Sequence, residues 1–162
     1  MVLAVRFLKL LPSAMKRLTR LGWLYTEAPV YFITACTEKR RKLLADPGSH
    51  SIFREFCEGA DEHGALVGKY VLMPDHFHLF VCIPPGPLTL ANWMKSLKNS
   101  LSKHWRAKGI EAPHWQKGYF DHLLRSEESH AEKWAYVRDN PLRAGLVKNA
   151  QDWPYAGEIK KL

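Results

Sequence analysis

The pattern of apolar and polar positions is clearest between residues 66 and 83, where two apolar runs meet at Pro74-Asp75. The tight turn, and the prolines that follow residue 83, predict two β-strands at 66–73 and 76–83 that form a hairpin. Successive side chains of a strand point to opposite faces, so we expect His76 and His78 on one face, with their Cβ atoms about 7 Å apart. The neighbouring residues are apolar and place this strand mostly in the core, so two histidines on one of its faces need an explanation.

Further segments complete the expected order of elements. A β-rich run at 30–37 predicts a first strand, and the stretch 114–125 is expected to begin as a loop and end as a short strand. Three helices are expected, each after a hydroxyl side chain that can cap it: Ser49 for a helix to about residue 63, Thr89 for 90–107, and Ser126 for a helix that ends at Asn140, before Pro141. The order β-α-β-β-α-β plus C-terminal helices predicts an α+β fold, a ferredoxin-like antiparallel sheet with helices on one face.

The first 28 residues are expected to form a basic N-terminal extension, followed by a single domain at 29–162. Leu18, Leu21 and Leu24 would share one face of a helix in this extension. A loosely docked helix and a DNA-contacting arm fit the extension equally well.

The charge balance favours a polyanionic partner. The chain has 162 residues and a formal net charge of +8, and the segments 1–26 and 88–108 each carry five Lys or Arg residues and no acid. Nucleic acid is the leading interpretation; an acidic membrane surface is the alternative, although no apolar run approaches the ~20 residues of a spanning helix. We expect no signal peptide, and the three cysteines lack paired spacing, which indicates the reducing cytoplasm.

The segment 90–107 has the pattern of an amphipathic helix. Its expected buried face consists of Leu90, Trp93 or Met94, Leu97, Leu101 and Trp105. Its expected polar face carries Lys95, Lys98, Asn99, Ser102, Lys103 and Arg106. A solvated face is the simplest interpretation, but the absence of any acid favours a phosphate-binding surface. For the charged run 38–42 a solvated loop is favoured over a phosphate contact.

The histidine pair alone permits a metal site and a hydrogen-bonded polar pair equally. Tyr136 and Asn140 strengthen the case for chemistry, because they are four residues apart near a helix end and would share one face. An exposed tyrosine is ordinarily a surface residue, and an asparagine before proline is ordinarily a helix stop. Asp75 is expected to fix the turn ahead of the histidines. Five other histidines have no functional residues grouped around them and are interpreted as surface or loop residues: His50, His63, His104, His114 and His130.

Three blocks of the sequence resemble a known family. Residues 71–81, around His76-Phe77-His78, look like the His-hydrophobe-His motif of the HUH single-strand nucleases in the setting of the IS200-like transposases. The blocks 115–122 and 136–147 follow in the matching order and point to the REP-associated tyrosine transposase branch. The resemblance spans about residues 29–157, so the basic extension lies outside it.

The resemblance implies a metal-dependent enzyme that cleaves and rejoins single-stranded DNA near palindromic hairpins through a covalent 5′-phosphotyrosine intermediate. The family's nucleophile matches Tyr136, and its metal ligands match His76, His78 and Asn140, with Mg²⁺ or Mn²⁺ as the working ion. His122 lies in a matching block and is expected to assist the site, to contact DNA, or to make a structural hydrogen bond. The basic face of the 90–107 helix would contact the DNA backbone.

Two other functions fit the same residues. A chromosomally retained copy that binds palindromes without cutting them would use the same basic face. An RNA-binding ferredoxin-like domain would carry aromatic pairs on its central strands, where this chain has histidines. The resemblance allows a monomer or a homodimer, with single-stranded or hairpin DNA rather than a membrane as the partner.

Overall fold

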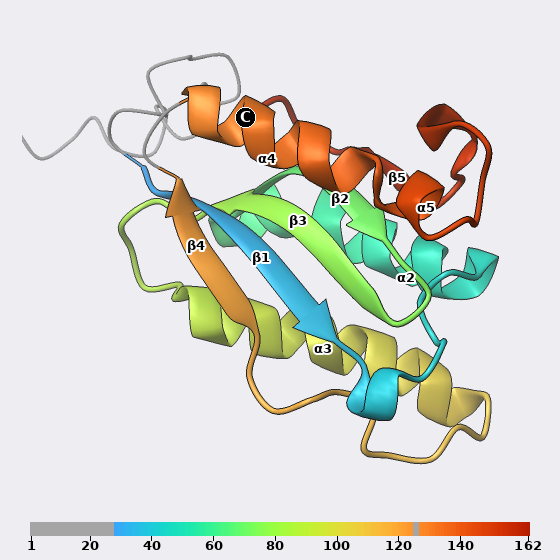
Figure 1. Ribbon diagram of the computed structural model, residues 1–162. Coiled ribbons are helices and arrows are strands. Elements are labelled where there is room, and N and C mark those ends of the chain that lie inside the picture. Colours follow the sequence, from blue (N-terminus) through green and yellow to red (C-terminus); the bar gives the residue numbers. More distant parts are fainter. Residues whose placement is uncertain (1–27, 125–126) are drawn as a thin grey trace, which may run out of the picture.

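The centre of the protein is a five-stranded antiparallel sheet in the order β4-β1-β3-β2-β5 (Figure 1). The computed structural model describes residues 28–124 and 127–162. The strands are β1 (Val30–Cys36), β2 (Leu66–Leu72), β3 (His76–Cys82), β4 (Phe120–Leu124) and β5 (Ala156–Glu158). The histidine-bearing strand β3 is central, so its side chains are flanked by other strands on both sides.

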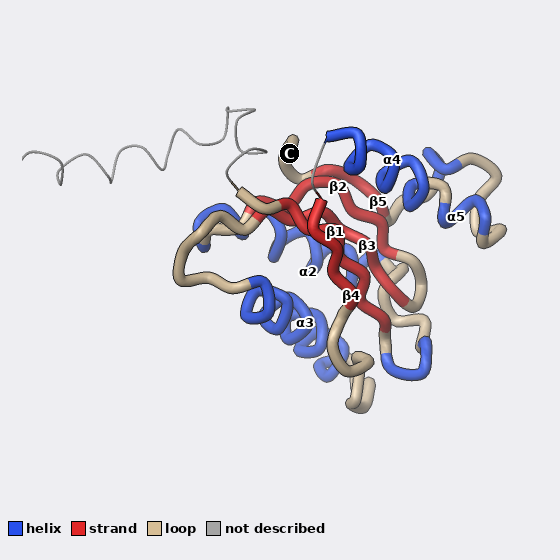
Figure 2. Tube along the Cα trace, turned by 60° about the vertical axis from the view of Figure 1, so that its left-hand side comes forward, coloured by secondary structure: helices blue, strands red, loops and turns tan. Residues whose placement is uncertain are grey.

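Helices cover both faces of this sheet. Helices α2 (Pro47–Glu58) and α3 (Leu90–Ala107) lie on one face, and α4 (Glu127–Arg138) lies on the other (Figure 2). The shorter elements are the 3-10 helices η2 (Glu38–Arg40), η3 (Ala60–His63) and η4 (Ala150–Asp152), and helix α5 (Asn140–Arg143). The expected α+β, ferredoxin-like arrangement is confirmed, and the first of the expected C-terminal helices lies on the second face.

Helix α3 begins and ends where the apolar pattern predicts. The Thr89 hydroxyl caps it by accepting a hydrogen bond from the Asn92 backbone N–H at 3.2 Å. Its buried residues are Trp93, Met94, Leu97, Leu101, Ser102 and Trp105. Ser102, predicted on the polar face, is buried because its hydroxyl accepts a hydrogen bond from the Trp115 indole N–H.

Helix α2 has a different cap from the predicted one. The Asp46 carboxylate accepts hydrogen bonds from the backbone N–H groups of Gly48 and Ser49, at 3.0 and 3.2 Å. Ser49 lies inside the helix, buried, where its hydroxyl accepts a hydrogen bond from the Trp105 indole. Asp followed by Pro is the stronger start signal, because proline is favoured in the first helical turn. The predicted end at Gly64 belongs to η3, and this glycine has a φ of 86°.

The C-terminal segment covers the outer edge of β2. The Trp153 indole donates to the Leu72 carbonyl at 2.9 Å, and the Leu72 N–H donates to the Tyr155 carbonyl at 2.8 Å. The Trp153 side chain and the Tyr155 backbone therefore attach this segment to β2, and the chain continues into β5. The predictions for the basic extension, with Leu18, Leu21 and Leu24, and for the Ser126 cap lie outside the described residues. Within the two described ranges no helix has the length and apolar character to cross a membrane.

The main core lies between the sheet and the helices α2 and α3. Strand β3 contributes Phe77, Leu79 and Val81, all completely buried. The Phe77 ring packs against Phe53 and Trp115, with centroid separations of 5.7 and 5.8 Å. Because side chains alternate along a strand, burial of these residues turns His76, His78 and Phe80 to the other face.

Phe77→Ala is expected to lower the free energy of unfolding by about 3–5 kcal/mol, because it leaves a cavity in the core. Urea denaturation followed by fluorescence measures the change. Phe120→Ala is the matched control: Phe120 lies on an edge strand and is 59% exposed, so its loss should stay within about 0.5 kcal/mol. Equal losses in the two variants would contradict the core assignment of Phe77.

Candidate active site

His76 and His78 lie together on the face of β3 that points away from α2 and α3. Their ring centroids are 4.9 Å apart, and the ring planes are nearly perpendicular. The ring of Phe32, on β1, stacks against His78 at 5.5 Å with an interplanar angle of 12°. The sheet therefore brings the two imidazoles together, as the alternation of the strand predicts.

Thr34 holds the ring of His78. The two residues are register partners on β1 and β3, and the Thr34 hydroxyl oxygen lies 2.8 Å from His78 Nδ1. Burial, together with the smaller effects of the charges of His76, Arg40 and Arg143, lowers the pKa of His78 to about 3. His78 is therefore neutral at physiological pH, with Nε2 left to bind a further partner, which is the form that ligates metal ions.

Asp75 holds the ring of His76. One carboxylate oxygen of Asp75 lies 2.6 Å from His76 Nδ1, and the other lies 2.9 Å from Arg40 Nε. A carboxylate on Nδ1 fixes the tautomer of an imidazole and directs its Nε2 to a ligand. The predicted turn-fixing role falls to the backbone carbonyl of Asp75, which accepts hydrogen bonds from the N–H and the hydroxyl of Thr37.

This donor set offers two imidazole nitrogens to a divalent cation. Both imidazoles have Nδ1 engaged, which leaves the two Nε2 atoms as ligands. Within residues 28–124 and 127–162, no cluster of three or more His, Cys, Asp or Glu residues could hold a metal ion. The remaining ligands would be an amide oxygen, water or phosphate oxygens, a set that suits Mg²⁺ or Mn²⁺ better than a closed zinc site.

Helix α4 packs against the same face and carries Tyr136. Its buried residue Val137 belongs to the cluster that contains Phe32 and Phe80, and Lys133 Nζ lies 5.7 Å from the Phe32 ring centre. Phe32 contacts both this helix and the His78 ring, so α4 is anchored beside the histidines. Tyr136 itself is 65% exposed and is therefore open to a macromolecular substrate.

Asn140 starts a new helix and does not end α4. Helix α4 stops at Arg138, and Asn140 with Pro141 forms the first turn of α5, a position that tolerates proline. The predicted sharing of one helix face by Tyr136 and Asn140 is therefore replaced by a connection across a helix junction. Gly145 follows α5 with a φ of 70°, in the left-handed region that favours glycine.

Arg143 makes that connection. Its guanidinium carbon lies 4.2 Å from the centre of the Tyr136 ring. Its Nη2 donates to the Tyr136 carbonyl at 2.7 Å and also to the Asn140 side-chain oxygen. Sequence reasoning missed Arg143, although its spacing of three residues from Asn140 was a usable signal. It also missed Thr34 and Arg40, because only the sheet register and the folded η2 turn bring them to the histidines.

The remaining histidines differ in their surroundings. His122 is exposed on β4 and is the register partner of Phe32, so it lies on the same face of the sheet as His76 and His78. Its support of the site stays a prediction. Both His114 and His130 are buried: His114 lies in a loop, as one of the two predicted settings, whereas His130 lies on α4, in neither. His114 Nε2 lies 3.0 Å from the Ile110 carbonyl oxygen, and the His130 ring packs 4.3 Å from Phe80. Of the others, His63 is exposed, whereas His50 and His104 are half-buried.

The basic residues predicted to bind DNA lie on α3, behind the sheet as seen from the histidines (Figure 1). Lys95, Lys103 and Arg106 are exposed. Lys98 is half-buried, donates a hydrogen bond to the Gly118 carbonyl at 2.5 Å and lies over the Trp115 ring. Lys98 therefore tethers the loop before β4, and DNA binding by this face stays a prediction.

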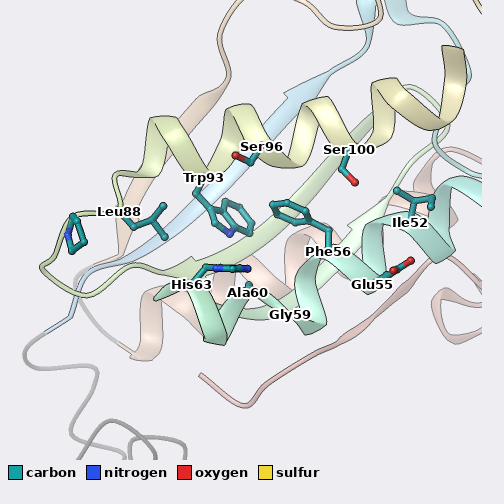
Figure 3. A pocket seen from close by; sticks show the side chains of 11 residues that line it. Ile52, Glu55, Phe56, Gly59, Ala60, His63, Leu88, Trp93, Ser96 and Ser100 are labelled. Atoms are coloured by element: carbon teal, nitrogen blue, oxygen red, sulfur yellow. The ribbon is translucent and has the colours of Figure 1, made fainter. Parts of the chain in front are cut away.

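A groove of about 840 Å³ runs between α2 and α3 (Figure 3). Its walls are largely apolar and include Ile52, Phe56, Leu88 and Trp93. None of the described residues that line it is a Lys or Arg. The groove therefore offers no lysine or arginine charge to a phosphate, and it lies on the opposite side of the sheet from His76 and His78.

The family model of the IS200-like transposases matches residues 27–140, a span that includes the histidine pair, Tyr136 and Asn140. The chain belongs to the IS200-like transposase family. A Haemophilus influenzae protein named as a candidate REP-associated tyrosine transposase is 26% identical over 145 residues, covering 82% of this chain and 81% of its own. The REP-associated tyrosine transposase of Escherichia coli K12 is 21% identical over 132 residues, covering 82% and 78%. Both relatives bear the name of the branch that the sequence blocks predict.

Two solved structures share the fold of this family member. A REP-associated tyrosine transposase bound to a REP hairpin superimposes with a TM-score of 0.66 at 21% identity, over 80% of this chain and 76% of that one. A candidate transposase from Deinococcus radiodurans R1 superimposes with a TM-score of 0.53 at 20% identity, over 74% and 95%. At these identities the likeness establishes the fold.

Lowering the pH is expected to destabilise the metal-free protein through His78. Its pKa in the folded state, about 3, lies below the ordinary value near 6.5, so the unfolded chain binds the proton first. Stability is therefore lost as the pH falls from about 6.5 towards 3, and this group accounts for about 2 kcal/mol at pH 5. Urea denaturation with a chelator at several pH values measures the loss. His78→Gln should remove this contribution; an unchanged pH dependence would assign it to other groups.

Proposed function

We propose that this family member is a metal-dependent transposase that cleaves and rejoins single-stranded DNA near palindromic hairpins. The observation that carries the proposal is the anchored pair His76 and His78, beside a helix that presents the exposed Tyr136. Membership of the IS200-like family and the fold shared with a transposase bound to a REP hairpin support hairpin DNA as the substrate.

In the proposed reaction, the Tyr136 oxygen attacks the scissile phosphorus and forms the new O–P bond. The phenol proton passes to solvent, and the bond from phosphorus to the 3′-oxygen breaks, leaving a free 3′-hydroxyl. In the rejoining step a 3′-hydroxyl oxygen attacks the phosphorus of the 5′-phosphotyrosine and loses its proton to solvent, while the bond from phosphorus to the Tyr136 oxygen breaks and the phenol regains a proton. No ATP is needed because one O–P bond replaces another. The high exposure of Tyr136 gives a DNA phosphate access to its oxygen.

The proposed ligands of the ion are the Nε2 atoms of His76 and His78 and the side-chain oxygen of Asn140. A bound Mg²⁺ or Mn²⁺ supplies neutralisation of the charge that develops on the phosphate. Asp75 and Thr34 position the two imidazoles by engaging their Nδ1 atoms. Arg40 in turn pairs with Asp75 and holds that carboxylate in place.

An aromatic side chain for stacking an unpaired base is available on the same face. Phe120 pairs with Thr34, which in turn pairs with His78, so the three residues form one row across β4, β1 and β3. Phe120 is exposed, whereas Trp93 and Trp105 are buried. We therefore propose Phe120 as the stacking residue, because base–aromatic stacking requires an open ring face.

Tyr136→Phe is expected to abolish covalent attachment to DNA. The assay incubates the protein with a labelled REP hairpin that carries single-stranded flanks and Mn²⁺, then separates adducts on a denaturing gel. His76→Ala and His78→Ala should reduce the adduct at least about 100-fold, because the metal contributes several kcal/mol of charge stabilisation. Tyr155→Phe is the matched control and should retain the adduct. An adduct that survives Tyr136→Phe would refute the assignment of the nucleophile.

The second candidate function is a palindrome-binding protein without cleavage, which the exposed basic face of α3 supports. Hairpin binding that persists in His76→Ala and His78→Ala, with no adduct from the intact protein under any divalent metal, would favour this function over the first.

The affinity for hairpin DNA is expected to fall steeply with salt, and the α3 residues should contribute to that slope. On single strands each phosphate contact contributes roughly 0.7 to the magnitude of the slope of log K against log salt. The variant in which Ala replaces Lys95, Lys103 and Arg106 should therefore have a slope smaller in magnitude by about 2. Fluorescence anisotropy over a salt series measures the slope. Lys98→Ala is the contrast, because Lys98 is tied to Gly118 and should leave the slope nearly unchanged. An unchanged slope in the triple variant would exclude α3 from the DNA interface.

A further inference from the structure

The side-chain oxygen of Asn140 already has a cationic partner in the described structure. Nη2 of Arg143 donates to this oxygen and to the Tyr136 carbonyl, while the guanidinium covers the Tyr136 ring. Arg143 is exposed, so its position is not imposed by packing in the core. Arg143 therefore contacts both Tyr136, the proposed nucleophile, and Asn140, the proposed third metal ligand.

This arrangement disfavours metal binding by Asn140. A guanidinium is always charged and cannot release a proton, so a divalent cation on the same oxygen would face a fixed positive charge. With Asn140 held in this way, the protein side of the metal site consists of the two imidazoles alone. Two neutral nitrogen ligands are a weak site for Mg²⁺ or Mn²⁺, which prefer oxygen ligands.

A DNA phosphate would compete for Arg143. Guanidinium pairs with phosphate through two parallel charge-assisted hydrogen bonds, which are roughly twice as strong as bonds to a neutral amide. Helix α4 packs on the face of the sheet that carries the histidines, and Arg143 contacts Tyr136 in the last turn of that helix, so the guanidinium lies on the side from which a phosphate would approach the histidine pair. Transfer of the guanidinium from Asn140 to the phosphate would free the amide oxygen at the moment the substrate arrives.

We propose that Arg143 is a positioning residue that couples DNA binding to completion of the metal site. Without DNA it keeps Asn140 away from the ion; with DNA it binds the phosphate and releases Asn140 to the ion. This inference rests on the proposed function, because it assumes that His76 and His78 hold the metal. Coupling of this kind is reciprocal, so the metal and the DNA must raise each other's affinity by the same factor.

The experiment measures Mn²⁺ binding by electron paramagnetic resonance in a Tyr136→Phe background, which prevents covalent chemistry. In the Tyr136→Phe protein, which retains Arg143, adding a REP hairpin oligonucleotide should increase the affinity for Mn²⁺ by about tenfold, within the usual range of coupling energies. Arg143→Ala should tighten Mn²⁺ binding without DNA by about threefold or more and reduce the effect of DNA to less than about twofold. Adding Asn140→Ala to Arg143→Ala should remove the gain.

Two variants separate this role from charge and from structure. Arg138→Ala removes a cation from the end of α4 that pairs with Asp139, and it should leave both Mn²⁺ affinities within about twofold of the background. Arg143→Lys keeps the charge but lacks the planar fork, so the coupling should be intermediate. Circular dichroism confirms that each variant is folded.

The outcomes distinguish the two proposals. If Arg143→Ala leaves DNA-free Mn²⁺ binding unchanged, or if the full effect of DNA survives, the role of Arg143 is refuted. An equal gain from Arg138→Ala would also refute it, since charge alone would then explain the result. If His76→Ala and His78→Ala do not weaken Mn²⁺ binding, the metal site of the proposed function fails instead.

Discussion

The structure depends on the division of β3 between two environments. Phe77, Leu79 and Val81 are completely buried against α2 and α3, so a shift of register by one residue would expose this apolar set and bury the histidines. The same burial presents His76 and His78 on the second face, at the centre of the sheet. The apolar core is thus what holds the imidazoles side by side.

The second face is organised by polar contacts around the two imidazoles. Each imidazole is held through Nδ1 by a different partner, His78 by a hydroxyl from β1 and His76 by the carboxylate that precedes it. The chain then returns from β4 through α4, whose residues Trp134 and Val137 pack against Phe32 and Phe80 and whose Tyr136 is exposed. Mobile surface residues would not retain this geometry, whereas a central strand and a packed helix do.

Arg143 links two of the proposed site residues, Asn140 and Tyr136, through one guanidinium. The Asn140 side-chain oxygen and the Tyr136 carbonyl accept hydrogen bonds from the same guanidinium, and both residues lie at the junction of α4 and α5. In the proposed function, a DNA phosphate would compete with these two acceptors for the guanidinium. The junction is therefore a place where substrate binding and assembly of the site can be linked.

Short-range patterns in the sequence determined much of this protein. Alternation of apolar and polar residues predicted the hairpin of β2 and β3 and the common face of His76 and His78. Helical spacing predicted the limits and cap of α3, and the sequence motifs predicted the family. Local pattern did not predict the side chains that contact the site residues, which are Thr34, Arg40 and Arg143. It also did not predict the burial of His114 and His130 or the hydrogen bond by which Lys98 holds the loop before β4. These contacts join residues through sheet register, a helix junction or a folded loop, and their energies depend on distances that local pattern does not encode. The tertiary structure alone decided which predicted residues meet, because burial selects one register and every side-chain contact follows from it.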